Sequence, residues 1–363
     1  MSPPPPPGSE ATRDAAGLPV SRYFHTAFAV TLAGLALGAV IGWQGSGTLG
    51  GALSTLLVVG VLAVLEISLS FDNAVVNANK LKDMRPEWQR RFLTWGILIA
   101  VFGMRVLFPL LIVVAAAHVG PIDALRLAAT RPDEYAHILE AAHLPIAAFG
   151  GTFLMMVGLS FFFDARKEVH WAQWLETRMA RYATVRGIEV TVVLIVVLAV
   201  GRFLPPVAHH AFTMAAIWGL LTFLLVEVIS GFLDTRQATL ATAARGGLGA
   251  FLYLEVLDAS FSFDGVIGAF ALSHNLFVIA IGLGIGAMYV RSMTIMLVER
   301  KTLTQYRYLE HGAFYAILAL SLIMYAQALV EIPEVVTGLF GAALIGMALR
   351  SSVRWNRKFG PDC

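Results

Sequence analysis

The sequence predicts an all-α protein, a polytopic bundle of transmembrane helices with an inverted internal repeat. Of its 363 residues, 58% are hydrophobic and only 14% are charged, whereas a soluble domain carries roughly 25% charged residues. The mean hydropathy is +0.73, and apolar runs recur from about residue 24 to about residue 350. Polar residues could not cover so much apolar surface in an aqueous fold, so we expect the bilayer to be the solvent.

Charge and cysteine content exclude several other classes of protein. The net charge of +2 is too small to indicate a nucleic-acid partner. The single cysteine is Cys363, so neither a disulfide framework nor a thiolate metal cage is expected. The His-Glu-x-x-His and Gly-x-Ser-x-Gly patterns of metalloproteases and serine hydrolases are absent, and we expect no enzyme.

Three regions follow along the chain. Residues 1–20 are rich in Pro, Gly and small polar residues, and they are predicted to form a disordered tail. Residues 21–350 form the transmembrane domain, and residues 351–363 a cytoplasmic tail. The first apolar run, 24–43, is longer than the 7–15 residues of a signal-peptide core, so we expect it to remain as a membrane span.

A helix needs about 20 mostly apolar residues to cross a bilayer. By that measure the chain holds about nine or ten spans, of which the last is short and could instead be re-entrant. The predicted spans are 24–43, 51–79, 92–117, 145–164, 188–204, 213–231, 247–270, 275–298, 312–329 and 336–350.

Lysine and arginine gather in every second loop between these spans. The loops on the opposite side carry only Arg126 and Arg131. Because basic loops stay in the cytoplasm, this pattern predicts a multi-pass protein with both termini cytoplasmic. An N-terminus without a transit-peptide pattern favours a bacterial inner membrane.

A ten-residue motif occurs twice. The segment 64–79 begins VLEISLSFDN, and the segment 256–270 begins VLDASFSFDG. Without gaps, Glu66 matches Asp258, and both motifs contain Ser-Phe-Asp just before their last residue. The loop charges make the two segments antiparallel, and inverted repeats with polar, partly broken helices at the midplane are typical of secondary transporters.

The acidic residues of the motifs are candidate ligands for a cation. A carboxylate at the bilayer centre costs about 2.5 kcal/mol or more, so each should face a protein interior or a wet cavity and have a partner. Carboxylate, amide and hydroxyl oxygens suit hard divalent ions such as Mn²⁺, Mg²⁺ or Ca²⁺, and neither motif contains His or Cys. The candidate metal ligands are Glu66, Asp72, Asn73, Asp258 and Asp264.

Other polar residues in the spans are candidates for a transport path or for charge partners. The arginines could pair with the acids or only snorkel to a surface, and Glu255 could be a helper or an interfacial residue. These candidates are Ser70, Asn77, Glu227, Glu255, Ser262, Arg105 and Arg291.

Helical spacing constrains how one site could form. On a regular helix Glu66 and Asp72 would lie about 120° apart. They could share a site if the helix opens near residues 70–72, or they could serve successive sites on a path. Gly265 would make the same opening easier in the second motif.

The outward loop 131–143 predicts an amphipathic surface helix. Asp133, His137 and Glu140 lie on one stripe of that helix and could collect metal. A solvated helix face is the plainer interpretation.

At these motifs the sequence resembles the DUF475 group of bacterial membrane proteins. That group is similar to the TerC tellurium-resistance proteins and to the Alx-type manganese exporters. Their marks are an acid followed by S-x-D-N in one half and an acid followed by F-x-x-D-S in the other. The resemblance covers about residues 50–330 and implies divalent metal handling, with Mn²⁺ efflux favoured. Two departures are Gly265, where TerC proteins have Ser, and additional spans at 188–231.

Two functions of different classes follow. The first is a transporter that exports a divalent cation, Mn²⁺ being favoured, with protons as the counter-ion. The second is a membrane accessory or scaffold protein in metal or tellurite stress, in which the acids are structural. Transport requires the acids of both halves, whereas a scaffold requires only fold and loops. Whether the protein acts as a homo-oligomer is left open.

Overall fold

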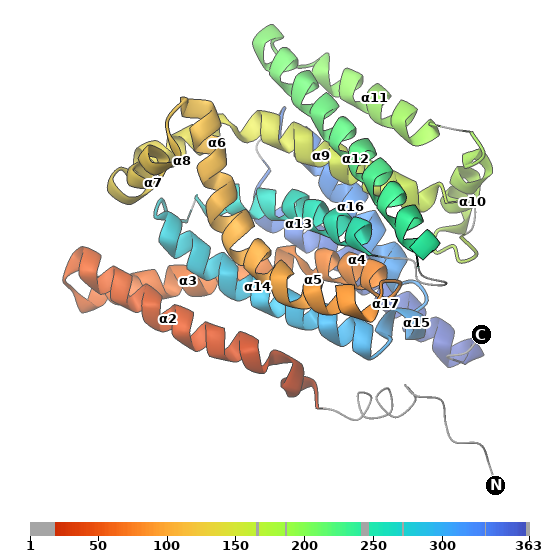
Figure 1. The fold of residues 1–363 in the computed structure, drawn as a ribbon, viewed down its shortest axis with the longest axis horizontal. Coiled ribbons are helices and arrows are strands. Elements are labelled where there is room, and N and C mark those ends of the chain that lie inside the picture. The colour runs from red at the N-terminus through yellow and green to blue at the C-terminus, as the bar shows by residue number, and fades with distance from the viewer. Residues whose placement is uncertain are drawn as a thin grey trace.

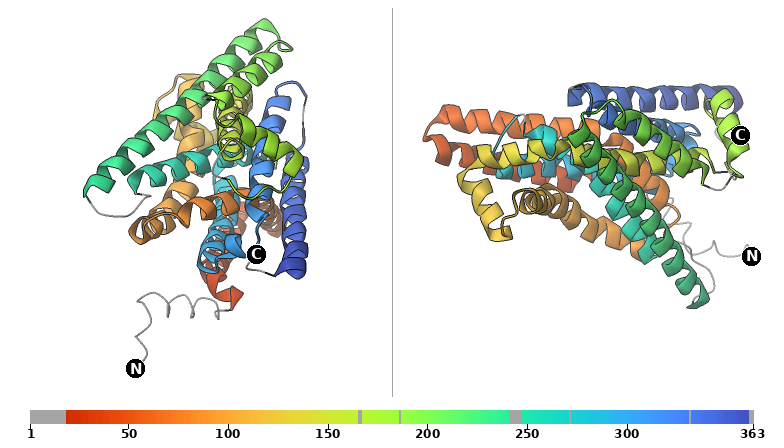
Figure 2. Two further views of the ribbon diagram at one scale, coloured as in Figure 1. Left: turned by 90° about the vertical axis from the view of Figure 1, so that its right-hand side faces the viewer. Right: turned by 90° about the horizontal axis from the view of Figure 1, so that it is seen from above.

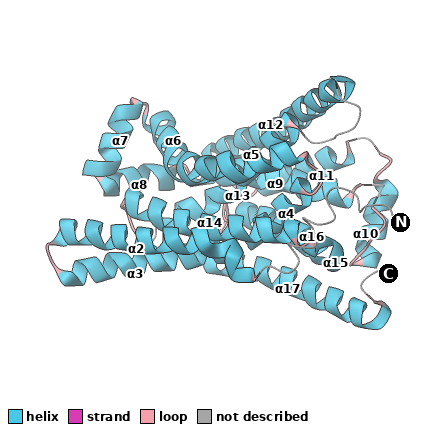
Figure 3. Cartoon of the chain, turned by 60° about the horizontal axis from the view of Figure 1, so that its bottom comes forward, coloured by secondary structure: helices cyan, strands magenta, loops and turns pink. Residues whose placement is uncertain are grey.

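The computed structural model describes residues 19–164, 167–185, 187–240, 247–270, 272–330 and 332–360. Within these ranges every regular element is a helix, in agreement with the predicted all-α class (Figure 3). Residues 1–18 of the predicted tail, and residues 361–363 at the other end, lie outside the described part.

The helical elements follow one another with short connections. Their bounds are η1 Val20–Phe24, α2 His25–Ser46, α3 Leu49–Leu69, α4 Phe71–Leu81, α5 Pro86–Leu98, η2 Ile99–Leu107, α6 Phe108–Ala117, α7 Pro121–Thr130, α8 Pro132–Ala141, α9 His143–Phe162, α10 Gln173–Tyr182, α11 Ile188–Gly201, α12 Pro206–Leu240, α13 Leu248–Ala269, α14 Leu276–Glu299, α15 Thr302–Gln305, α16 Leu309–Ala326 and α17 Glu334–Phe359.

Seven helices of the described chain are long and apolar enough to cross a membrane, or up to eight with a bent pair. The seven are α2, α3, α9, α12, α14, α16 and α17, in which α2 counts together with η1. The count is lower than the nine or ten spans predicted. Three predicted spans are not among the seven. The span 92–117 is interrupted, and 188–204 gives the 14-residue α11. The span 247–270 gives α13, which carries the acidic motif and is not among the helices that are apolar enough.

The last predicted span is longer than the sequence indicated. The helix α17 extends over 26 residues to Phe359, whereas we expected a short or re-entrant span at 336–350. The basic residues near its end continue the helix rather than beginning a separate tail.

The second predicted span is broken at Ser70. The helix α3 ends at Leu69 and α4 begins at Phe71, with Ser70 at φ −102° and ψ 17°. The backbone N–H of Asn73 donates to the Asp72 carboxylate at 2.9 Å. Asp side chains compete in this way with the backbone hydrogen bonds of a helix. The Ser70 backbone amide still donates to the Glu66 carbonyl at 3.0 Å, and the Ala74 amide donates to the Ser70 carbonyl at 3.2 Å, so these two helical bonds persist across the break.

The third predicted span changes its winding. A π-helix, η2, joins α5 to α6, and α6 carries Pro109 in its first turn. Proline cannot donate to the carbonyl four residues earlier, here that of Arg105, which favours wider winding just before it. Beyond η2, the helix that ends at Ala117 bends by 106° into α7.

The bundle is built around α9 and α14. The helix α14 packs against α2, α3, α4 and η2, and α9 packs against α12 and α16. In Figure 1 the α2–α3 pair lies along one flank and the α11–α12 pair along the other, and the turned view in Figure 2 agrees.

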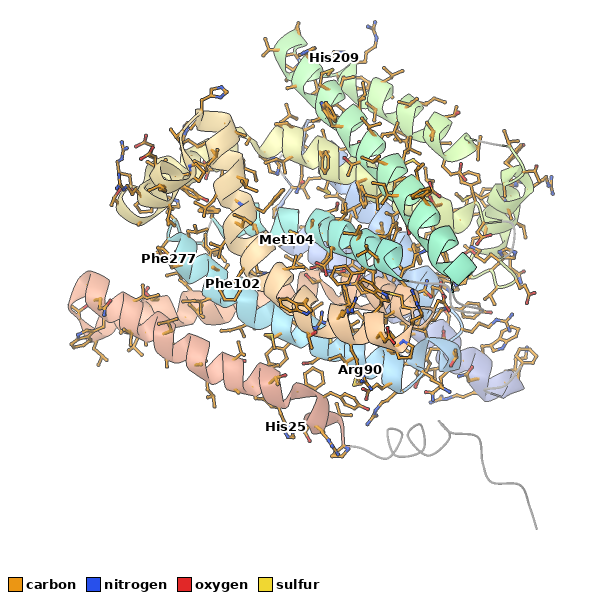
Figure 4. The ribbon with its side chains drawn as sticks, in the orientation of Figure 1. His25, Arg90, Phe102, Met104, His209 and Phe277 are labelled. Carbon is orange, nitrogen blue, oxygen red and sulfur yellow. The ribbon has the colours of Figure 1, made fainter. Side chains whose placement is uncertain are left out.

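The two motif segments run in opposite directions. The α3–α4 segment runs from left to right in Figure 1, whereas α13 runs from right to left. The segments that follow them are also antiparallel: in Figure 4 the α5–η2 segment passes from Arg90 toward Phe102, while α14 starts at Phe277 on the left. This arrangement agrees with the inverted repeat predicted from the loop charges.

Candidate cation site

Glu66 lies buried at the end of α3, next to the helix break. Its carboxylate Oε1 accepts a hydrogen bond from Ser70 Oγ at 3.0 Å. The same oxygen forms an ion pair with Arg105 of η2. Glu66 is 2% exposed and Arg105 is 3% exposed. Of the two roles predicted for Arg105, the structure therefore shows pairing with an acid.

A hydrogen bond joins the two halves of the repeat. Asn73 Nδ2, at the start of α4, donates to Asp258 Oδ1 of α13 at 2.6 Å. A carboxylate accepts hydrogen bonds and cannot donate them when ionised, so the amide nitrogen must face Asp258. The carbonyl oxygen of Asn73 consequently points elsewhere.

Glu66 borders two small cavities. The first has a volume of about 30 Å³ and is lined by Glu66, Ser68, Ser70, Asp72 and Gly265, with apolar residues of α16 and α17. Because α3 breaks at Ser70, Glu66 and Asp72 reach one cavity although a regular helix would separate them. The opening considered from the spacing is therefore present in the first motif, whereas α13 continues through Gly265 as a helix.

The second cavity is also about 30 Å³ and lies between the two motifs. It brings together an acid from each half, an arginine from each half and two amides. The polar residues that line it are Glu66, Asn73, Asn77, Arg105, Asp258, Arg291 and Thr294. A space of this size accepts an ion or a water molecule and excludes an organic substrate.

Two side-chain amides of α4 have oxygen atoms without a hydrogen-bond partner. Asn73 Oδ1 and Asn77 Oδ1 are buried and have no hydrogen-bond partner, and the two residues are only 3% and 4% exposed. A buried polar atom without a partner costs about 1–3 kcal/mol, so such atoms point to a ligand, an ion or ordered water.

Arg291 lines the second cavity, and Glu255 lies near it against the same turn of α5. The Arg291 guanidinium donates to the Phe92 carbonyl and lies 4.9 Å from the centre of the Phe92 ring. Glu255 is 8% exposed, so it is buried rather than interfacial. A Cβ on Gly96 would lie 2.9 Å from Glu255 Oε1 and 3.4 Å from Arg291 Nη1, which places both charged groups against the same turn of α5.

Close packing of α14 on α3 depends on a glycine. A Cβ on Gly286 would lie 2.4 Å from Glu66 Cβ and 2.9 Å from the Ala63 carbonyl oxygen. Gly265 similarly faces Glu66, because its Cβ would lie 3.2 Å from Oε2. These two glycines let helices of the second half approach the acid of the first.

A much larger cavity, here called the vestibule, lies at the far end of α4. Its volume is about 740 Å³, and Asn79, Lys80 and Lys82 form one wall. Glu227 of α12 lines the vestibule and is exposed, so the structure separates it from the buried acids. The acids of the lining are Asp83, Asp164, Glu189, Glu227 and Glu310.

Two predicted site residues cannot be placed. The side chains of Ser262 and Asp264 lie outside the described residues, although the backbone of α13 passes through both. Among the described residues, no three His, Cys, Asp or Glu side chains lie close enough to hold a metal ion. A cation held between Glu66 and Asp258 would therefore also need amide or backbone oxygens.

The stripe predicted on the outward loop has another partner. The segment 131–143 forms α8, as a helix was predicted there. Asp133 Oδ1 pairs at 2.5 Å with Nδ1 of His274, which lies in the connection from α13 to α14. Both side chains are largely exposed. The pair ties α8 to the second half of the repeat.

Sequence reasoning missed two features. Thr294 lines the second cavity, but a single threonine in an apolar span gives no signal by itself. The other is a polar hub around Glu176, which is 0% exposed. Lys167 Nζ lies 2.7 Å from Glu176 Oε2, Tyr315 donates to Oε1 at 3.1 Å, and His311 Nε2 lies 3.4 Å from Oε2.

The charges of this hub shift each other's titration. Burial by itself would raise the pKa of Glu176, but the hydrogen bonds from Lys167 and the Ala172 amide hold that pKa below its usual value. Burial lowers the pKa of Lys167, and Glu176 offsets part of that effect. The hub fastens α10 and the preceding loop to α16.

Comparisons with known proteins give a family. A family model described as a protein of unknown function, DUF475, matches residues 71–359. The match begins at the start of α4 and contains the whole second motif. Searches of curated proteins and of solved structures found no match.

Proposed function

The chain belongs to the DUF475 family, and from that premise and the site geometry we propose that it is a membrane transporter which exports a divalent cation. The observation that carries the proposal is the second cavity, where Glu66 of one half and Asp258 of the other line an ion-sized space. Buried acids from inverted halves, meeting next to a broken helix, are typical of secondary transporters.

The ligand chemistry favours Mn²⁺. The described polar groups that line both cavities are carboxylates, amides, hydroxyls and arginines, without His or Cys. Oxygen ligands suit Mg²⁺, Ca²⁺ and Mn²⁺. The resemblance of the motifs to those of the TerC proteins and the Alx-type manganese exporters selects Mn²⁺ among these.

Coupling to protons follows from the same carboxylates. Three described acids, Glu66, Asp72 and Asp258, line the two cavities together with two arginines, so the carboxylates of this poorly solvated site cannot all ionise without a further cation. A metal ion or a proton can supply the missing positive charge, and protonation removes the ligand charge that holds the metal. Alternating access of the two inverted halves would then exchange one for the other across a bacterial inner membrane, with both termini cytoplasmic.

Total cellular metal in manganese-loaded cells tests the proposal. Cells that express the wild type are expected to hold less manganese than cells with an equal amount of an Asp72→Asn/Asp264→Asn variant, because the variant loses an acid in each half. Inductively coupled plasma mass spectrometry measures the difference. The Asp123→Asn variant, which changes an exposed acid of α7 outside the motifs, is the matched control and should behave as wild type.

Two results would contradict the proposal. Equal content of manganese and every other divalent metal in wild-type and variant cells would exclude export through these acids. Lower manganese with both proteins would show that the motif acids are dispensable, in favour of an accessory role. A difference between them would justify reconstitution in liposomes with a manganese-sensitive dye.

A further inference from the structure

Thr337, in the first turn of α17, brings a further hydroxyl group to the first cavity. The residue is 6% exposed and lines the cavity together with Asp72. The other two buried threonines of the described chain, Thr152 and Thr294, each donate to the carbonyl oxygen four residues earlier. Thr337 Oγ1 has no hydrogen-bond partner among the described residues. Burying a polar atom in this state is costly, so the hydroxyl points to a ligand in the cavity.

Close packing holds Thr337 beside the broken helix. A Cβ on Gly338, the next residue, would lie 2.4 Å from Leu69 Cδ2, and Leu69 is the last residue of α3. The helix α17 packs along α3 and also contacts α4. The position of Thr337 near the break at Ser70 is therefore fixed by the contact between α17 and α3.

The first cavity contains a carboxylate whose charge no described neighbour balances. Asp72 is 6% exposed, and its carboxylate accepts a hydrogen bond from the backbone N–H of Asn73. Glu66, the other acid of the lining, is paired with Arg105. None of the described residues that line the cavity is basic. The lining therefore carries one excess negative charge, and a buried carboxylate of this kind requires a cation or a proton.

The oxygens of the lining favour a small metal ion over a proton. A proton needs one carboxylate, whereas a hard cation is held by several oxygens. Glu66 Oε2 faces Gly265, which lines the cavity, and the hydroxyl oxygens of Ser70 and Thr337 can each accept or coordinate. A volume of about 30 Å³ accommodates one ion. A single excess charge then selects a monovalent ion.

We infer that the first cavity is a Na⁺ site of its own, in which Asp72 supplies the charge and Ser70 and Thr337 supply neutral oxygens. Glu66 borders this site and the second cavity, but Asp72 and Thr337 line only the first. The ends of broken membrane helices bind Na⁺ or protons in secondary transporters. The inference goes beyond the proposed function, because Na⁺ binding here requires no divalent ion.

The Thr337→Val variant tests the site, because it removes the hydroxyl and nearly keeps the shape of the side chain. In purified full-length protein, the melting temperature of wild type should rise saturably as NaCl replaces choline chloride at constant ionic strength. Thr337→Val should raise the apparent dissociation constant for Na⁺ by about tenfold or more, whereas Thr337→Ser should stay within about threefold of wild type. Asp72→Asn should abolish the response to Na⁺.

Stability without Na⁺ separates a ligand from a structural hydroxyl. In choline chloride Thr337→Val should melt at or above the wild-type temperature, because it lacks the unpaired hydroxyl, but in saturating NaCl it should melt below wild type. Thr213→Val is the matched control, since Thr213 Oγ1 of α12 is also buried without a described partner but does not line the first cavity. Its response to Na⁺ should equal that of wild type. An equal loss for Thr337→Val in both salts would show a structural role only and overturn the inference.

Further outcomes separate this site from the proposed transport. A wild-type melting temperature that does not respond to Na⁺ would overturn the site, and a response to pH alone would place a proton on Asp72 instead. If Thr337→Val weakens Mn²⁺ binding as strongly as Na⁺ binding, the cavity belongs to the divalent site and the inference is wrong, while the proposed function stands. If wild type responds to Na⁺ but neither binds nor transports a divalent ion, the proposed function fails and the Na⁺ site stands.

Discussion

The ion pair of Glu66 with Arg105 shows how a single residue sets the character of the site. Both side chains are almost fully buried, and removing one partner of such a pair leaves an uncompensated charge. The pair also means that the carboxylate at the centre of the site is already neutralised by a tethered cation. If the chain transports a cation as proposed, access of that ion to Glu66 depends on Oε2, which faces Gly265.

A double-mutant cycle measures this pair. Arg105→Met should destabilise the protein by about 3–5 kcal/mol, because it leaves Glu66 charged and unpaired. Adding Glu66→Gln should recover most of the loss, since the remaining group is neutral. Chemical unfolding in detergent gives both values. The Glu66→Gln single variant completes the cycle, and a double-variant loss equal to the sum of the two single losses would show that the pair is not coupled.

The residues of the site were predictable only where the sequence repeats. Glu66, Asp72 and Asp258 are found by aligning two motifs, because acids in apolar spans are rare and expensive. Thr294 gives no such signal, and neither does Glu176, which lies in a charged segment that resembles an exposed helix. Its partner Tyr315, which donates a hydrogen bond to Glu176, lies 139 residues later in the sequence.

At the scale of elements, two departures from regular helix shape the molecule. The break at Ser70 places Glu66 and Asp72 at one cavity, and the π-helix η2 carries Arg105 toward Glu66. Sequence periodicity finds apolar segments but not a change in winding within them, which is why 92–117 was predicted as one straight span. Such π-helical segments occur frequently at functional sites.

The Glu176 hub should control how firmly α10 is attached. Glu176→Gln leaves Lys167 buried without its partner, and the expected loss is about 3–5 kcal/mol near neutral pH. The folded state holds the pKa of Glu176 below its usual value, so its contribution is present above about pH 4.3 and declines as pH falls through the lower folded-state pKa. Melting temperatures at pH 7 and at pH 4 check this.

The matched control for the hub is Glu168→Gln, which changes an exposed carboxylate in the same loop. It should melt as wild type does at both pH values. A gap between wild type and Glu176→Gln that widens on acidification would contradict the assigned role of the carboxylate.

At the scale of the whole molecule, the sequence predicted the all-α bundle and the inverted repeat. The antiparallel course of α3–α4 and α13 agrees with the alternation of basic loops. Seven helices of the described chain, or up to eight with a bent pair, meet criteria of length and composition. The predicted spans outside that number include α11, which has only 14 residues, and α13, which carries three acids. Apolar runs show where helices lie, but not where a helix is shortened, broken or bent.

The predicted orientation has a direct test. Native Cys363 and a cysteine at Gln44, in the α2–α3 hairpin, should react with an impermeant thiol reagent from opposite sides of the membrane. Each is examined as the single cysteine in intact cells and in inverted vesicles. Reaction of both from one side would contradict the predicted topology, because an even number of spans would then separate residue 44 from the C-terminus.

The contrast in size between the vestibule and the two cavities has a consequence for the choice of ion. A cation in a space of about 740 Å³ keeps its hydration shell, but one that enters a cavity of about 30 Å³ must give up most of it. Mg²⁺ sheds water reluctantly and demands near-ideal octahedral geometry. In the proposed transporter, a passage that strips the ion would therefore select against Mg²⁺ by the cost of dehydration, even though oxygen ligands that suit Mg²⁺ line the walls.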